Sequence, residues 1–61
     1  MRDYDFKCLD AAGQLVTHDT YACEHDVAAI LAAVQSLQRC AAIEIWSGGA
    51  LIKTVRPSQL N

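Results

Sequence analysis

The chain has few basic residues and no long apolar run, and each absence excludes a class of protein. Lys and Arg number five against seven Asp and Glu, which gives a net charge of −2. Nucleic-acid binding needs clustered Lys and Arg to displace phosphate counterions, so we expect no nucleic-acid partner. Charged residues interrupt the first twenty positions and no apolar run is long enough to cross a membrane, so we expect neither a signal peptide nor a membrane contact.

Cysteine is also too sparse for a secreted disulfide scaffold. The three cysteines, Cys8, Cys23 and Cys40, cannot all pair within one chain and are widely spaced. We therefore predict free thiols and a cytoplasmic location. Structural zinc ligands come in close pairs, and only Cys23 and His25 approach such a pair, so we expect no metal and no cofactor.

The short length predicts one small domain over residues 1–61 that associates with a partner. A chain of this size buries only about 60% of the surface that its unfolded form exposes, so its stability margin is thin. Disulfides, metals or partner subunits usually supply the missing stability. Since we expect neither a disulfide nor a metal, we predict that a partner subunit supplies this stability.

Two segments at the amino-terminal end are typical of a β-hairpin. Residues 4–10, YDFKCLD, alternate between apolar and polar side chains, which is the pattern of a half-buried strand. Asp10 to Gly13 suits a three-residue connection with a type I turn and a left-handed glycine. A second strand is predicted from about Leu15 to Tyr21.

The stretch AIEIWSGGALIKTV, residues 42–55, predicts a second hairpin. Gly48 and Gly49 suit the central positions of a tight turn, which require positive φ. A phosphate-binding loop would be followed by a helix, whereas Ala50 to Val55 has the pattern of a strand that ends before Pro57. This turn predicts the strand pairs Ser47–Ala50, Trp46–Leu51, Ile45–Ile52 and Glu44–Lys53.

Between the hairpins, residues 24–39 are predicted to form a helix. Its larger apolar residues recur three and four positions apart, which predicts one core-facing side: Val27, Ile30, Leu31, Val34 and Leu37. The opposite side would carry the small residues Ala29, Ala33 and Ser36. It has no charge between Asp26 and Arg39, so this Ala-rich back is one candidate contact surface.

The element order predicts an α+β fold of the type ββαββ. Two hairpins around one helix favour a four-stranded antiparallel sheet in the order 2-1-3-4, with the helix on one face. The expected register places Lys7 beside Glu44 and Glu44 beside Lys53 on the outer face. On the inner face it stacks Phe6, Ile45 and Ile52, with His18 next to Phe6.

The helix-free face of the sheet is the second and favoured contact surface. Since Ile43 and Ile45 point to the helix, Trp46 must point away from it. The alternative is that the Trp46 ring covers its own neighbours and no partner. The residues expected to form an interface on this face are Trp46, Leu51, Val55, Leu9, Leu15 and Tyr21.

Tyr4, Phe6, Gly13 and the following Ala-rich helix resemble short bacterial ββαββ proteins of unknown function. A weaker resemblance is to HicB-type antitoxin domains, which begin strand-strand-helix with a cysteine before the helix, as Cys23 is here. The sequence HDTYACEHD replaces the Pro-Asp-Leu-Pro-Gly-Cys run of that family. No functional residue is implied for this chain by either resemblance.

Taken together, these patterns favour a non-enzymatic protein–protein interaction module of a bacterial cytoplasm. Its expected partner is a second copy of itself, as a homodimer, or another protein. The alternative is a small-ligand or thiol-redox role centred on Cys23 and His25, because a thiol at a helix amino terminus has its thiolate stabilised.

Overall fold

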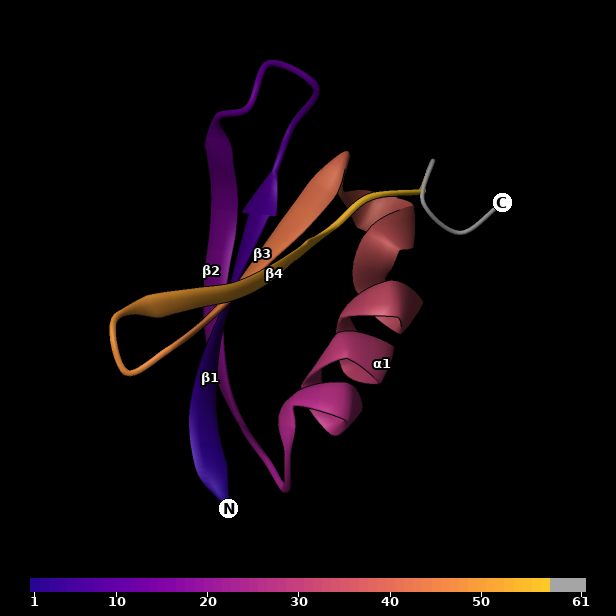
Figure 1. Cartoon of the computed structure of the whole chain (residues 1–61). Helices are drawn as coiled ribbons and strands as arrows, with labels where there is room; N and C mark the ends of the chain where they lie inside the picture. Colours follow the sequence, from indigo (N-terminus) through magenta and orange to yellow (C-terminus); the bar gives the residue numbers. More distant parts are fainter. Residues whose placement is uncertain (58–61) are drawn as a thin grey trace.

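The computed structural model describes residues 1–57 and confirms the ββαββ fold. All neighbouring strands are antiparallel, in the order β2-β1-β3-β4, and the helix lies on one face (Figure 1). The helix is followed by a short 3-10 turn, η1. The elements are β1 (Arg2–Leu9), β2 (Leu15–Cys23), α1 (Asp26–Ser36), η1 (Leu37–Arg39), β3 (Ala42–Ser47) and β4 (Ala50–Val55).

The turn of the first hairpin is as predicted. Gly13 has φ +82°, and its N–H donates a 2.9 Å hydrogen bond to the Asp10 carbonyl. The Asp10 side chain then accepts hydrogen bonds from the N–H groups of Ala12 and Gln14, both at 2.9 Å. An aspartate that bonds to the backbone ahead of it favours this turn. The following strand ends at Cys23, two residues beyond the predicted end.

The helix begins later and ends earlier than predicted. His25 is its N-cap, with Nδ1 accepting a 3.1 Å hydrogen bond from the Ala28 N–H. The side chain therefore satisfies one of the amide groups that the first turn leaves unpaired. After Ser36 the chain continues as η1.

The predicted core-facing side of the helix is confirmed for Ile30, Val34 and Leu37 and is wrong for Val27 and Leu31. Ala29 and Ala33 are fully buried against the sheet, whereas Val27 and Leu31 are each 59% exposed. Small side chains let the helix axis approach the sheet closely, and larger residues then fit at the flanks, as the half-buried Ile30 does. Of the predicted Ala-rich back, Ala29 and Ala33 are therefore in the core, and Ser36 is exposed.

The register between β1 and β3 is confirmed, but that between β3 and β4 is wrong beyond the turn. Lys7 faces Glu44 and Trp46 faces Leu51, as expected. A bulge then takes one extra residue from β4, so Ile45 faces Lys53 and Glu44 faces Thr54. One extra residue exchanges the faces of all side chains that follow it. Lys53 is therefore no part of the predicted charge row.

A second bulge, at the start of β2, moves His18 to the outer face. The register shifts between Cys8 and Leu9, so that Lys7 faces His18. Asp19 takes the place beside Phe6 that was predicted for His18.

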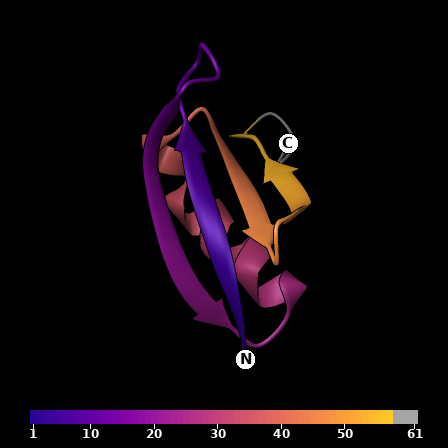
Figure 2. The same ribbon diagram turned by 90° about the vertical axis from the view of Figure 1, so that its left-hand side faces the viewer.

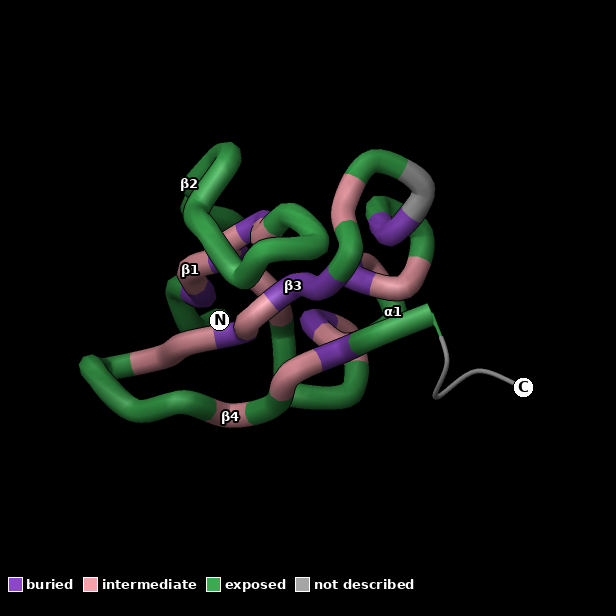
Figure 3. Tube along the Cα trace, turned by 90° about the horizontal axis from the view of Figure 1, so that it is seen from above, coloured by how far each residue is buried: buried purple, intermediate pink, exposed green. Residues whose placement is uncertain are grey.

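The core lies between the helix and the three strands β1, β3 and β4. Strand β2 forms the left-hand edge of the sheet in Figure 2 and is exposed along its length apart from its half-buried last residue (Figures 2 and 3). The buried residues of the core cluster are Tyr4, Phe6, Ala29, Ala33, Leu37, Ile43, Ile45 and Val55.

A disulfide joins Cys8 to Cys40, so the prediction of free thiols is wrong for these two residues. Their Cα atoms are 5.5 Å apart, and 32 positions separate them in sequence. A cross-link over a loop of this length restricts the unfolded chain by an amount worth on the order of 3 to 4 kcal/mol. The disulfide therefore supplies stability that so small a core lacks. Cys23 is free and half-buried.

Candidate functional site

Four of the six predicted interface residues lie on the open face of the sheet, and two do not. Trp46 faces Leu51, and Leu9 faces Leu15, all on the side away from the helix. The predicted position of Val55 is wrong, because the bulge in β4 turns this side chain into the core, where it is 2% exposed.

The predicted position of Tyr21 is wrong as well, because this residue lies on the helix side of β2. It faces the buried Tyr4, and its ring contacts that of Phe6 edge to face, with the centroids 5.1 Å apart. The Tyr21 side chain remains 51% exposed, because the helix does not reach over this strand.

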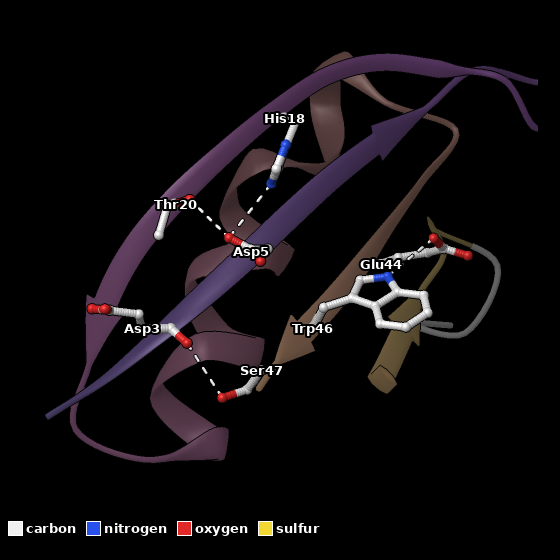
Figure 4. Close-up of polar contacts among 7 residues, drawn as sticks. All are labelled: Asp3, Asp5, His18, Thr20, Glu44, Trp46 and Ser47. Carbon is white, nitrogen blue, oxygen red and sulfur yellow. Dashed lines mark hydrogen bonds and ion pairs between the residues drawn. The ribbon is translucent and has the colours of Figure 1, made fainter. Parts of the chain in front are cut away.

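The Trp46 ring is held by its own neighbours on the open face. Its Nε1–H donates a 3.2 Å hydrogen bond to Glu44 (Figure 4). The Lys7 ammonium lies 4.7 Å from the ring centroid. The first contact uses the N–H group of the indole ring and the second uses its π-face, and both are favourable for this ring. This geometry is the one expected of a ring that covers its neighbours.

A charged pair divides the apolar residues of the open face. The pair of Lys7 and Glu44 crosses the middle of the sheet, between Leu9 at one end and Trp46 at the other. Exposed patches that mark interfaces are usually contiguous. The apolar residues predicted for this face therefore form two groups, one on each side of the charged pair.

A polar cluster ties β1 to β2 on the same face. The Asp5 carboxylate accepts a 2.8 Å hydrogen bond from the Thr20 hydroxyl and lies 3.4 Å from His18 Nε2 (Figure 4). The hydrogen bond from Thr20, and then that from His18, lowers the pKa of Asp5 below its usual value. These contacts fix the side chains on this part of β2.

The outer edge of β2 presents unpaired backbone groups. The Leu9 carbonyl accepts a hydrogen bond from Ala41, next to β3, whereas the Asp10 N–H donates to Gln14, on the β2 side. Successive residues of β1 therefore bond to opposite neighbours. Among residues 1–57 no strand lies beyond β2. By this alternation the N–H and C=O groups directed away from the sheet belong to His18, Thr20 and Ala22.

The two edges of the sheet differ in their protection. Strand β4 has six residues, a bulge and Lys53, and Arg56-Pro57 follow it. Charges, bulges, prolines and short length are the devices that keep sheet edges from pairing. Strand β2 has nine residues, and its span Thr17–Cys23 contains no Lys, Arg or Pro and no bulge. From Thr17 to Cys23 the β2 edge is therefore regular and open, and Asp19 is its one acidic residue.

A cleft lies between the inner side of β2 and η1. Its volume is about 400 Å³, and both Cys8 and Cys40 line it. Phe6 and Tyr21 supply aromatic surface, and Arg39 lines it as well. Sequence patterns gave no sign of this cleft, because it depends on how far the helix reaches over the sheet.

Cys23 and His25, the centre of the alternative role, each have a structural contact. The Nδ1 atom of His25 is occupied by its bond to the Ala28 N–H. Cys23 packs against the core. Within residues 1–57 no group of three or more His, Cys, Asp or Glu residues is placed to hold a metal.

Comparison with family models, with characterised proteins and with solved structures finds no match to this chain. No helix within residues 1–57 is long and apolar enough to cross a membrane.

Proposed function

We propose that this protein is a non-enzymatic interaction module that forms a homodimer by pairing the β2 edges of two copies. The observation that carries the proposal is the contrast between the two edges, since β4 is protected and β2 is not. Addition of a strand to an open edge is a common mode of protein recognition. A second copy is the occupant whose matching edge the chain itself supplies.

A two-fold axis perpendicular to the sheet joins the two β2 strands antiparallel and makes one eight-stranded sheet. Isologous pairing of this kind closes after two copies, because each β2 edge is then used and each β4 edge is protected. The two helices lie on the same side of the joined sheet. The assembly is therefore a dimer that does not extend into a filament.

The free backbone groups favour one register, centred on Thr20. Thr20 then faces Thr20 of the other copy, and His18 faces Ala22 in both directions, which forms about six backbone hydrogen bonds. A register centred on Asp19 would place two carboxylates opposite each other, which is unfavourable. In the Thr20 register the exposed Tyr21 ring gains a neighbour, Asp19 of the other copy.

Amide hydrogen exchange tests this pairing residue by residue. The N–H groups of His18, Thr20 and Ala22 should exchange slowly at high protein concentration and quickly on dilution. The N–H groups of Tyr4 and Phe6, inside the ladder of one chain, serve as controls and should show little dependence on concentration. Fast exchange at the three edge positions under all conditions would exclude the proposed interface.

The cytoplasmic location and the bacterial resemblances stay predictions. Low-molecular-weight thiols keep most cytoplasmic cysteines reduced, whereas an oxidising compartment would preserve the Cys8–Cys40 bond. The alternative role centred on Cys23 and His25 is not favoured by any contact among the described residues.

A further inference from the structure

We propose that the cleft over the Cys8–Cys40 disulfide is a thiol–disulfide exchange site for small zwitterionic thiols, meaning amino-acid thiols that carry a carboxylate and an ammonium group. The cleft volume of about 400 Å³ lies within the range of about 300 to 1,000 Å³ found for ligand pockets. An amino acid or a short peptide fits such a volume. The bond to be attacked lies in the lining itself.

The two cysteine residues differ in exposure, which sets the direction of attack. Cys40 is half-buried, whereas Cys8 is only 8% exposed. Thiol–disulfide exchange depends on access to the sulfur that is attacked. The incoming thiolate therefore attacks Cys40, and Cys8 is the leaving group.

The site also provides for the released thiol. Cys8 Sγ lies 3.9 Å from the Arg39 carbonyl oxygen. In the disulfide this sulfur has no proton to donate, but after cleavage the protonated Cys8 thiol has this oxygen as its acceptor.

The exchange balances in two steps. A thiolate RS⁻ bonds to the Cys40 sulfur, and the electron pair of the Cys8–Cys40 bond leaves on Cys8, which takes up a proton. A second RS⁻ then attacks the RS sulfur of the mixed disulfide, releasing RSSR and the Cys40 thiolate, which takes up a proton. Two RSH are thus oxidised to RSSR, and the protein disulfide is reduced to two thiols.

The chain itself does not supply the attacking thiol. Cys8 faces Thr17, and Cys23 faces Arg2, six residues away along β1. At about 3.3 Å per residue, Cys23 lies roughly 20 Å from Cys8. The reductant must therefore come from solution.

Charges on two walls of the cleft favour a zwitterion. Arg39 lines it from η1, and Asp19 lines it from β2. A guanidinium pairs well with a carboxylate, and a carboxylate pairs with an ammonium group. Phe6 and Tyr21 provide apolar surface between them for the carbon chain. A neutral thiol gains from the apolar surface alone.

The test measures the rate at which the purified, oxidised protein is reduced by L-cysteine and by 2-mercaptoethanol, at matched thiolate concentrations. The readout is the number of thiols alkylated after quenching in denaturant, which rises from Cys23 alone to all three cysteines. Arg39→Gln should slow the reaction with L-cysteine about threefold, as expected for the loss of one partly exposed ion pair. It should leave the rate with 2-mercaptoethanol unchanged, and Arg56→Gln, the matched control outside the cleft, should change neither rate.

Equal slowing of both thiols by Arg39→Gln would assign Arg39 a structural role and overturn the proposal. An unchanged rate with L-cysteine would overturn it too. So would a purified protein, never treated with a reductant, in which all three cysteines are already alkylated.

Discussion

The Tyr4 hydroxyl donates a 2.6 Å hydrogen bond to the Asp26 carboxylate, which joins the first strand to the first residue of the helix. Tyr4 is fully buried, so this bond also satisfies its hydroxyl inside the fold. The bond to Asp26 raises the pKa of Tyr4 above its usual value of 10.0. The contact anchors the start of the helix to the sheet.

The pH dependence of stability follows from this contact. A raised pKa in the folded state means that the stabilisation is complete below pH 10.0 and is lost as the pH rises through the folded-state pKa of Tyr4. We expect the melting temperature of the wild-type protein to fall in this alkaline range. Tyr4→Phe should melt lower at neutral pH and show a weaker alkaline decline. An equally steep decline in the variant would contradict the assignment to Tyr4.

The bulge in β4 is tested by the exposure of two side chains. Val55→Ala should lower the free energy of unfolding by roughly 2 kcal/mol, because Val55 is in the core. Leu51→Ala removes more atoms but should change it by less than about 1 kcal/mol, because Leu51 lies exposed on the open face. Chemical denaturation measures both values. A larger loss of stability for Leu51→Ala than for Val55→Ala would support the register without a bulge.

The diglycine turn of the second hairpin requires positive φ at both positions. Gly48 has φ +59° and Gly49 has φ +80°, and no atom lies within 4 Å of a Cβ added at either. Gly48→Val should therefore cost about 1 to 2 kcal/mol through backbone strain alone. Gly48→Asn, the matched control, should cost less, since asparagine tolerates this conformation. Equal unfolding midpoints for the two variants would argue against this turn.

Strand order and turns were predictable because their signals are local. Alternation defined β1, and the glycine pair defined the second turn. The register of Lys7 with Glu44 was predicted because it places opposite charges side by side, and it is confirmed. The two bulges carry no comparable signal, because each inserts one residue into a strand whose pattern stays plausible in either register. The errors at Val55 and His18 both come from this source.

The disulfide could have been predicted from the sequence. The predicted register already placed Cys8 opposite Ile43, and Cys40 lies only three residues before Ile43. An odd number of cysteines argues against complete pairing but allows one pair. The rotation of the helix, in contrast, depends on how closely Ala29 and Ala33 approach the sheet, which periodicity alone does not determine.

The open edge of β2 has a signal in the amino-acid composition. Thr17 to Cys23 lacks Lys and Pro, while the last strand carries Lys53 and precedes Pro57. Both edges could be named once the strand order was known. The predicted interface was centred on Trp46, whose ring contacts Lys7 and Glu44.

Sedimentation of the wild-type protein and three variants tests dimerisation through β2 most directly. Ala22→Pro removes an N–H that points away from the sheet, so the fold should survive while the dissociation constant rises at least about thirtyfold. Leu31→Glu and Trp46→Ala, on the exposed side of the helix and on the open face, should leave it unchanged. A wild-type protein that stays monomeric up to about 100 µM, far above the roughly 1 µM that corresponds to 8.2 kcal/mol of binding, would contradict the account. The account would also be contradicted if Ala22→Pro left the dimer intact while Leu31→Glu or Trp46→Ala dissociated it.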